Sequence, residues 1–397
     1  MALLRKNSRK SSMSSSTMLT TSKRILIFST SYFPLVGGAE VSVKEITDRL
    51  TDIQFDLITA KQKSDLPKSE KIGNINVYRL GLGSPIIDKL LLPFHGAIFA
   101  LKLNKKNHYD AFWCIMVTFA SGAAYIANWF QKMVPIILTL QEGDSENWLR
   151  YRWFGMIDLS WRLSLARTNI LTAISNYLLE RARRLGYKGK MELIPNGVDI
   201  EKFEFRNSNF EIKDEIMLIT TSRLVEKNAV GDIIEALKFL PENVKLKILG
   251  TGPLAHELKS LTKKQKLASR VSFVGHVRYE EIPRYLHHAD IFIRPSLSEG
   301  MGNSFIEAMA AGLPVIATPV GGIVDFLKDP SNSSEQAATG LFCEVNNPGS
   351  IAEQVRKLSS DKLLRDRIIE NARKMVEEKY DWNLIANEMR SRVFQSV

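Results

Sequence analysis

The stretch that decides the fold runs from Asp290 to Ala317 and reads DIFIRPSLSEGMGNSFIEAMAAGLPVIA. Asp290–Arg294 is rich in apolar and β-branched residues, which favours a strand, and a glycine-bearing loop follows it. A helical run then extends from Phe305 until Gly312-Leu313-Pro314 stops it. The sequence therefore predicts a strand, a loop and a helix in direct succession.

Two carboxylates bracket this loop, eight positions apart at Glu299 and Glu307. The N-terminus of a helix offers unpaired backbone N–H groups and the positive end of the helix dipole. Carboxylates beside such an end accept hydrogen bonds from hydroxyl groups, so the arrangement suits a ligand with both hydroxyls and phosphate, as in a nucleotide sugar. A plain loop acid at 299 and a solvated helix residue at 307 are the alternative interpretation.

The apolar run Ala308–Ala317 makes the pattern more specific. With the two acids it resembles the Glu-x7-Glu signature of retaining glycosyltransferases with the GT-B fold, in particular glycosyltransferase family four. The resemblance covers nearly the whole chain after residue 23. It implies an α/β fold with two Rossmann-like, doubly wound domains that face an interdomain cleft, and a C-terminal helix that crosses back to the first domain.

Short β-rich runs alternate with helical patterns along the chain, as is typical of parallel sheets with crossover helices. We expect a disordered, basic, Ser-rich tail at 1–22, an acceptor-binding domain at 23–203, a nucleotide-sugar-binding domain at 204–380, and a terminal helix at 381–397 that packs on the first domain. The predicted strands are Arg24–Phe28, Gln54–Thr59, Asn76–Leu80, Ala111–Val117, Pro135–Leu140, Asn169–Ala173, Ile216–Thr221, Val244–Leu249, Val271–Val274, Asp290–Arg294 and Pro314–Ala317.

Charge and cysteine content indicate where in the cell the protein resides. The formal net charge is +11, and residues 1–24 carry six Lys and Arg and no acid. Residues 111–131 carry no charge over a length that could span a membrane, but their polar residues favour a buried strand and a core-facing helix. Cys114 and Cys343 suit small core positions in a reducing compartment. We expect a cytoplasmic protein, with peripheral attachment to the inner face of the membrane as the alternative.

Two cations, Arg223 and Lys227, follow the strand Ile216–Thr221 and precede a predicted helix. Cations beside a helix N-terminus suit a diphosphate, although an Arg and a Lys in a loop are common by chance. The resemblance implies that both hold the donor diphosphate and stabilise charge on the leaving group. Asn228 stands where the family often has Gly, and Asn tolerates left-handed backbone angles.

The resemblance also implies the remaining donor contacts. Glu299 and the backbone amides after it would hold the sugar hydroxyls, and Glu307 would bind the ribose diol. The glycine pair after the first strand would let the backbone approach the phosphates, with a tight strand-to-helix turn as the alternative. The catalytic set is Glu299, Arg223 and Lys227, and the donor-binding set is Gly37, Gly38, Gly252, His276, Val277, Gly300, Met301, Gly302, Asn303, Ser304 and Glu307.

The sequence argues against a nicotinamide dehydrogenase and against a metal-binding enzyme. Gly250-Thr251-Gly252-Pro253 follows a strand and nominally matches a dinucleotide fingerprint, which expects an acid about 20 residues further on. No acid follows the next strand, where the sequence is Gly275-His276-Val277-Arg278, so a nicotinamide dehydrogenase is disfavoured and no cofactor is expected. The chain also has neither Asp-x-Asp nor His-Glu-x-x-His, and we predict no metal site.

The first domain departs from the family pattern at Gln141, where family members commonly have a His close to the transferred sugar. Gln donates a hydrogen bond but cannot take a proton. We expect Gln141 and Glu142 on the acceptor side, and an ordinary loop acid is the alternative for Glu142.

Residues 148–190 hold nine basic residues against two acids, with interleaved Trp, Tyr and Phe. Such a face would attract an anionic membrane surface or a lipid-linked acceptor. The alternative is a solvated helix pair with buried Trp, and no recognition motif supports nucleic acid.

By resemblance, the chain is a retaining, metal-independent hexosyltransferase. It would move a sugar from a UDP- or GDP-sugar to an acceptor hydroxyl in the synthesis of cell-surface polysaccharide, glycolipid or glycoconjugate. The acceptor would be a carbohydrate or a lipid-linked molecule. A GT-B sugar-nucleotide epimerase and a non-catalytic nucleotide-sugar or surface-binding module remain as alternatives.

Overall fold

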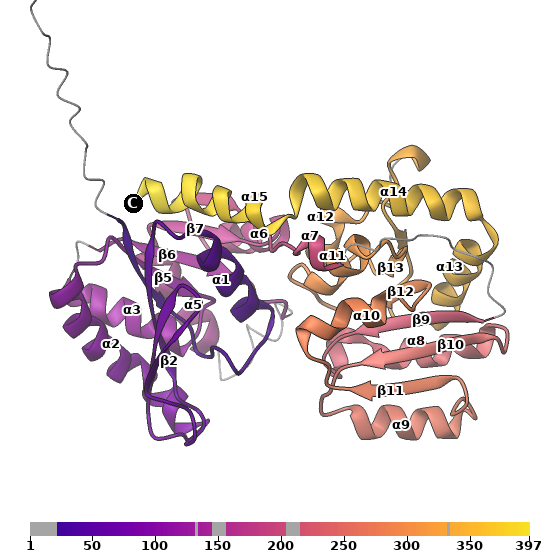
Figure 1. The fold of residues 1–397 in the computed structure, drawn as a ribbon, viewed down its shortest axis with the longest axis horizontal. Coiled ribbons are helices and arrows are strands. Elements are labelled where there is room, and N and C mark those ends of the chain that lie inside the picture. The colour runs from indigo at the N-terminus through magenta and orange to yellow at the C-terminus, as the bar shows by residue number, and fades with distance from the viewer. Residues whose placement is uncertain (1–21, 132–133, 145–155, 204–214, 332–333) are drawn as a thin grey trace, which may run out of the picture.

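The computed structural model describes residues 22–131, 134–144, 156–203, 215–331 and 334–397. The tail predicted at 1–22 therefore lies almost wholly outside the described residues. The described chain forms two α/β domains side by side, each with its own sheet (Figure 1).

The first domain is built on a sheet with the strand order β3-β4-β2-β1-β5-β6-β7-β8, in which all pairs are parallel except β3 with β4. Its strands β1, β2, β5, β6 and β7 are mostly buried apolar runs, as strands covered on both faces must be. Its elements are β1 Arg24–Phe28, α1 Gly38–Arg49, β2 Gln54–Ala60, β3 Ser69–Ile72, β4 Ile75–Leu80, α2 Ile87–Asn107, β5 Ala111–Ile115, α3 Phe119–Phe130, β6 Ile136–Leu140, α5 Met156–Arg167, β7 Ile170–Ala173, α6 Asn176–Arg184, β8 Lys190–Leu193 and α7 Ile200–Phe203.

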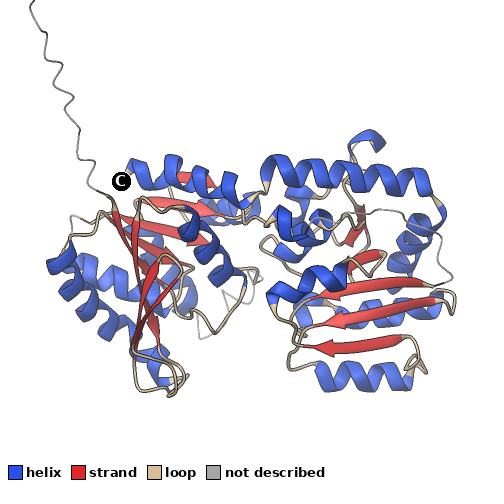
Figure 2. Cartoon of the chain, in the orientation of Figure 1, coloured by secondary structure: helices blue, strands red, loops and turns tan. Residues whose placement is uncertain are grey.

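The second domain is built on a fully parallel sheet with the order β11-β10-β9-β12-β13-β14. Helices lie around both sheets, as Figure 2 shows. The elements of the second domain are β9 Ile216–Thr221, α8 Val230–Ala236, β10 Val244–Leu249, α9 Ala255–Lys264, β11 Val271–Gly275, α10 Ile282–Leu286, β12 Ile291–Arg294, α11 Asn303–Ala310, β13 Val315–Ala317, α12 Ile323–Phe326, β14 Leu341–Phe342, α13 Pro348–Ser360, α14 Lys362–Lys379 and α15 Trp382–Glu388.

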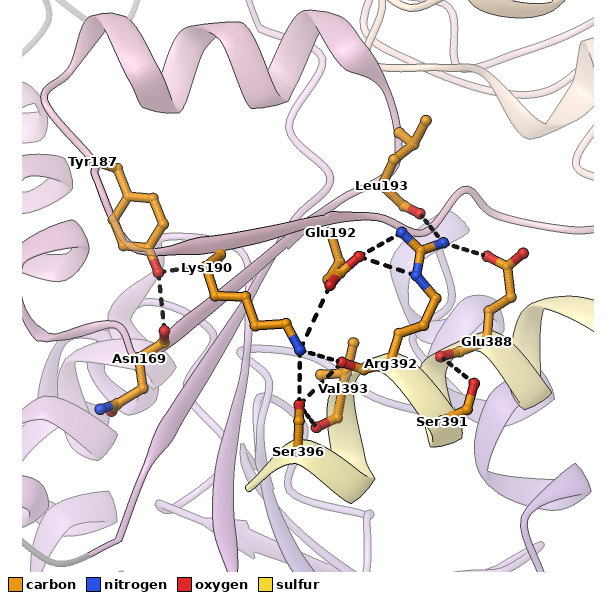
Figure 3. A network of polar contacts seen from close by, with 10 residues as sticks. All are labelled: Asn169, Tyr187, Lys190, Glu192, Leu193, Glu388, Ser391, Arg392, Val393 and Ser396. Carbon is orange, nitrogen blue, oxygen red and sulfur yellow. Dashed lines mark hydrogen bonds and ion pairs between the residues drawn. The ribbon is translucent and has the colours of Figure 1, made fainter.

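The C-terminal segment crosses back onto the first domain, as expected (Figure 1). The backbone N–H of Val198 donates to the Tyr380 carbonyl (2.7 Å) at the crossing point. The Phe394 ring then packs on Trp113, with ring centroids 5.2 Å apart. Figure 3 shows the polar part of the same contact: the Arg392 guanidinium lies between Glu192 of β8 and Glu388 of α15. Lys190 donates to the Arg392 carbonyl (2.8 Å).

The structure confirms the α/β class, the doubly wound domains and the crossing helix, and it adds strands that the sequence pattern did not reveal. These are β3, β8 and β14, which are short edge strands with too few apolar residues to stand out. The uncharged run 111–131 forms β5 and α3, as predicted. Among the described residues, no helix is long and apolar enough to cross a membrane.

Candidate functional site

Strand order gathers the predicted donor residues at one edge of the second sheet. β9 lies between β10 and β12, so the chain leaves these central strands toward opposite sides of the sheet. Ligands of open α/β sheets bind at such a switch point, outside the carboxyl ends of the strands. The loop after β9 carries Arg223 and Lys227, and the loop after β12 carries Glu299. The Leu297 N–H donates to the Lys227 carbonyl (2.7 Å), which joins the two loops.

Arg294, the last residue of β12, is the centre of this edge and was not singled out from the sequence. Its guanidinium forms an ion pair with Glu299 and donates to Ser304 Oγ (2.9 Å) and Asn228 Oδ1 (3.1 Å). It also lies over the Phe305 ring, 5.3 Å from the centroid. Both side chains of the Arg294–Glu299 pair are largely buried. Arg294 therefore fixes the carboxylate that we predicted to contact the transferred sugar.

Glu307 lies in α11 with its carboxyl group buried. Burial raises the pKa of this carboxyl to about 7, although the positive charge of Arg294 opposes the shift. Among the described residues, none donates a hydrogen bond to the carboxyl group of Glu307. A buried carboxyl with spare hydrogen-bonding capacity suits a ligand hydroxyl pair, which would supply the missing donors.

The loop between Glu299 and Glu307 takes its conformation from Gly302 and from the contacts of the residues beside it. Gly302 has a φ of +86°, in the left-handed region, and starts α11 two residues earlier than the sequence predicted. The Met301 side chain is buried in the core, so only its backbone is available to a ligand. The Gly300 N–H already donates to Glu299 Oε1 (3.0 Å). Ser304 is engaged by Arg294 through its hydroxyl.

Loops of the first domain lie directly against this edge. The Asn196 amide donates to Asn303 Oδ1 (3.0 Å) and to Gln141 Oε1 (3.2 Å). Gly38 approaches the same Asn303, because a methyl group in place of its hydrogen would lie 3.5 Å from Asn303 Nδ2. Gly37 precedes α1 in the same turn. The predicted residues Gly37, Gly38, Gln141 and Asn303 are thus brought together from distant parts of the chain.

Gln141 and Glu142 follow β6 and have different surroundings. Gln141 Nε2 donates to Ser42 Oγ over 3.4 Å, a long hydrogen bond, so its amide is held only loosely on that side. Glu142 accepts from the Val117 N–H (2.6 Å) and from the Gln141 N–H (3.0 Å). Burial raises the pKa of Glu142, and these backbone donors oppose the rise. Glu142 therefore holds the loop after β5 as well as facing the interface.

The predicted phosphate cations differ in their exposure and partners. Lys227 Nζ lies 3.0 Å from Asp144 Oδ1 of the first domain, and both side chains are more than a third exposed. Arg223 is exposed on the loop after β9. A half-exposed ion pair contributes little to stability, so Lys227 could exchange the Asp144 carboxylate for a phosphate at low cost.

The other predicted donor residues lie along the same edge of the second sheet. The loop with Gly252 packs on the Arg223 loop, where Leu224 N donates to the Thr251 carbonyl (3.0 Å). The Gly250 N–H donates to the Gly275 carbonyl (2.7 Å), and this bond joins that loop to the end of β11. His276 follows as an exposed side chain and Val277 as a half-buried one. These positions border the edge, but no hydrogen bond or ion pair joins Gly252, His276 or Val277 to Glu299 or Glu307.

One expectation about the Lys227 loop was wrong. The left-handed residue is Ala229, with φ +46°, and not Asn228. The reason is that Glu226–Asn228 form a 3-10 turn, which moves the sharp bend one position on. Asn228 instead uses its buried side chain, whose amide donates to the Arg223 carbonyl (2.7 Å) while its oxygen accepts from Arg294. The helix predicted from about Ala229 to Leu240 is formed by α8 and by a 3-10 helix at Leu237–Phe239 that continues it.

The basic, aromatic stretch is only partly visible. Trp148, Arg150, Tyr151, Arg152, Trp153 and Phe154 lie outside the described residues. Of the remainder, Trp161 is buried in the core and Arg181 is buried against Tyr177 and the Asp144 carbonyl. These two residues match the alternative of buried Trp within a packed helix pair. The other basic residues of the stretch that the structure describes are exposed: Arg162, Arg167, Arg183, Arg184, Lys188 and Lys190.

Groups of three or more His, Cys, Asp or Glu that could hold a metal ion do not occur within the described ranges. The groups that offer positive charge to a phosphate at this edge are Arg223 and Lys227, together with the backbone amides at the start of α11.

Family comparisons agree with this geometry. Residues 36–202 match the family model Glycosyltransferase Family 4, and residues 201–375 match the model Glycosyl transferases group 1. The chain belongs to glycosyltransferase family four. The first match holds the Gly37–Gly38 turn and Gln141, and the second holds Arg223, Lys227, Glu299 and Glu307.

Related proteins are also named as glycosyltransferases. An uncharacterised glycosyltransferase of Methanocaldococcus jannaschii is 29% identical over 385 residues, which cover 89% of this chain and 93% of the relative. A GDP-mannose-dependent alpha-(1-6)-phosphatidylinositol monomannoside mannosyltransferase of Mycobacterium tuberculosis is 28% identical over 244 residues, 56% of this chain and 60% of that protein. The family-four glycosyltransferase described here is thus similar over nearly its full length to other glycosyltransferases.

Solved structures show the same fold. Sucrose-phosphate synthase from Thermosynechococcus elongatus superposes with a TM-score of 0.81 at 21% identity, over 94% of this chain and 99% of that one. HepE from Anabaena, solved with UDP and glucose, gives a TM-score of 0.75 at 18% identity, over 94% of this chain and all of that one (100%). At these identities the likeness establishes the GT-B fold alone.

Proposed function

We propose that this glycosyltransferase moves a hexose from a UDP- or GDP-sugar to an acceptor hydroxyl, with retention at the anomeric carbon and without a metal ion. One observation carries the proposal: Glu299 and Glu307 are both buried beside Arg294, at the edge where Lys227 meets the first domain. The sugar hydroxyls would contact Glu299, and the ribose diol would contact Glu307.

The reaction breaks the bond between the anomeric carbon and the diphosphate oxygen, and the electron pair leaves with the nucleoside diphosphate. Lys227 and Arg223 would stabilise the negative charge that grows on that oxygen, which lowers the barrier because the charge is larger in the transition state than in the substrate. The acceptor oxygen bonds to the same face of the anomeric carbon, and its proton passes to the departing phosphate. This route needs no protein base, which fits an amide at Gln141.

The acceptor is proposed to be a carbohydrate or a lipid-linked molecule in polysaccharide, glycolipid or glycoconjugate synthesis. Support comes from the mycobacterial relative, which is named as a phosphatidylinositol monomannoside mannosyltransferase. A cytoplasmic location is proposed with it, since both cysteines are buried free thiols. We also propose an anionic membrane surface as a partner of the protein.

The test is a donor screen. The purified protein is incubated with UDP- and GDP-linked hexoses in EDTA, with simple alkyl glycosides as acceptors, and release of UDP or GDP is measured. Proton NMR of the product then gives the anomeric configuration. Nucleotide release with an α-product from an α-donor supports the proposal. An inverted product contradicts retention, activity lost in EDTA contradicts the metal-free step, and conversion of the free sugar nucleotide to its epimer favours the epimerase.

A further inference from the structure

Helix α2 presents an apolar face to the outside of the first domain. Its exposed large side chains recur at helical spacing along its first half, and we call them the apolar stripe: Ile86, Ile87, Leu90, Leu91, Phe94 and Ile98. Ile86 is 72% exposed, Phe94 61% and Ile98 68%. Side chains of this size rarely gather on the surface of a soluble monomer unless the surface binds something.

The opposite face of α2 is fully used in packing, so the stripe is not an accident of a loosely held helix. Leu92, Gly96 and Ala100 are buried against α3, and a methyl group at Gly96 would collide with the Ala123 side chain at 2.7 Å. α3 itself ends in Trp129 and Phe130, which are 65% and 73% exposed. The Arg167 guanidinium lies 5.0 Å from the centre of the Trp129 ring.

Charge along α2 points to a partner of negative sign. Between Ile86 and Tyr109 the chain carries Lys89, Lys102, Lys105 and Lys106, and its single acid is Asp88. Asp88 is buried and accepts from the backbone N–H groups of Gln62 (3.2 Å), Leu82 (2.9 Å) and Gly83 (2.7 Å), so it does not offset the lysines at the surface. An apolar face followed by a basic end is the pattern of a helix that lies in the interface of an anionic bilayer.

The same Asp88 contacts place the stripe with respect to the site. Gln62 follows β2 and its side chain donates to the Thr30 carbonyl (2.9 Å) in the loop after β1. The start of α2 is thereby held at the carboxyl edge of the first sheet, the edge that also carries Gly37, Gly38 and Gln141. A surface that docks here would set the acceptor side of the domain interface close to that surface.

We propose that the apolar stripe of α2 is a membrane-docking surface that inserts shallowly into an anionic bilayer, with Lys102, Lys105 and Lys106 on the lipid headgroups. It lies in the interface and does not span the bilayer. The basic, aromatic stretch predicted from the sequence is not needed for it. The inference does not rest on glycosyl transfer, because docking is measured with neither donor nor acceptor present.

The test is vesicle sedimentation with the full chain, using vesicles of phosphatidylcholine alone or mixed with phosphatidylglycerol. The wild type should bind the mixed vesicles more tightly than the neutral ones. The variant Leu90→Gln/Phe94→Gln/Ile98→Gln should lose at least about tenfold in partition coefficient, because each exposed apolar side chain gains from burial in lipid. The variant Lys102→Gln/Lys105→Gln/Lys106→Gln should lose the preference for anionic vesicles.

The control is Phe239→Gln/Leu363→Gln, which removes two exposed apolar side chains from the second domain. It should bind like the wild type. Far-UV circular dichroism confirms that every variant is folded. The proposal is overturned if the wild type does not bind mixed vesicles or if the stripe variant binds them as well as the control. Sedimentation velocity adds a further outcome: a wild-type dimer that the stripe variant abolishes, without vesicle binding, would make the stripe a contact between two copies.

Discussion

The two sides of the domain interface are built differently. On the second domain, Arg294 ties Glu299, Ser304 and Asn228 into one largely buried cluster. On the first domain, Gln141 has a long hydrogen bond to Ser42 (3.4 Å), and Asp144 has a half-exposed ion pair with Lys227. The donor-side carboxylate is thus held by a buried ion pair before any ligand arrives, whereas the Gln141 amide and the Asp144 carboxylate on the facing side are held by a long hydrogen bond and a half-exposed ion pair.

The difference is what a transferase of this kind requires. A carboxylate that is proposed to hold the sugar, such as Glu299, positions the sugar best when it is fixed in advance, because no reorganisation is then needed during the reaction. The acceptor side must admit a different molecule in each enzyme, so few fixed contacts there leave room for change. The predictions below change residues of the second-domain side first and then a residue of the first-domain side.

The largest effect is expected from Arg294→Met. Removal of one partner from a buried ion pair leaves the Glu299 charge without compensation, and such losses cost about 3–5 kcal/mol of unfolding free energy. Chemical denaturation measures the change. The double variant Arg294→Met/Glu299→Gln should recover much of the stability but not the activity. Arg278→Met, which breaks an exposed Arg–Glu pair, is the matched control and should change stability little. Equal effects of the two Arg variants would show that the Arg294 cluster is not special.

The next effect concerns the cations at the diphosphate. Lys227→Ala or Arg223→Ala should lower kcat by about 10²–10³, the scale of losing one donor that acts on transition-state charge. Steady-state kinetics with the donor found in the screen measures it. Lys238→Ala, which removes a surface lysine paired with Glu235, should leave kcat unchanged. Turnover near the wild-type value in both cation variants would remove the role assigned to them.

A third effect is a pH dependence at Glu307. The folded pKa of about 7 lies above the value of an unfolded glutamate, so the folded state holds the proton more tightly. The linked stability is present at acid pH and falls as the pH rises from the unfolded pKa to about 7, by at most about 3 kcal/mol. Glu307→Gln should therefore be more stable than the wild type above pH 7 and show little of this slope. Denaturation at several pH values checks it, and parallel profiles for both proteins would refute the assignment.

The smallest effect tests the looser side. Asp144→Ala frees Lys227 from its partner and should change the melting temperature little, because half-exposed ion pairs contribute at most about 1 kcal/mol. The same change should tighten binding of UDP or GDP by about twofold to fivefold, since the phosphate no longer competes with the carboxylate. Calorimetric titration measures the affinity, with Asp144→Asn as a shape-matched variant. Weaker nucleotide binding in both variants would mean that Asp144 helps to hold the donor.

The same contrast explains which parts of the site the sequence predicted. Part of the second-domain edge is encoded in one contiguous stretch, so the strand, loop and helix that carry Glu299 and Glu307 were predicted from local pattern, with the start of α11 placed two residues late. Arg294 was missed because a single Arg at the end of a strand is common. The signal that could have identified it is its position, at the end of an otherwise apolar strand and next to a glycine-bearing loop. Its role depends on Asn228, which arrives from another loop.

The first-domain side could not be predicted in the same way. Asn196, Gln141, Ser42 and Asp144 meet only through the fold, and no spacing between them is visible along the chain. The short strands β3, β8 and β14 were missed for a similar reason, because their stability depends on neighbouring strands more than on their own residues. The left-handed turn was placed one residue early, at Asn228, since the 3-10 turn before it depends on packing.

The most direct test of the central claim is calorimetric titration of UDP and of GDP into the wild type in the presence of EDTA, repeated with Arg294→Met/Glu299→Gln and Lys227→Ala. The account predicts that one nucleotide binds without a metal ion. At a concentration 100 times its Kd it should then stabilise the fold by about 2.7 kcal/mol in a parallel melt. Lys227→Ala should bind it more weakly. No binding of either nucleotide, or binding that EDTA abolishes, would contradict a preformed, metal-free donor site on the second domain.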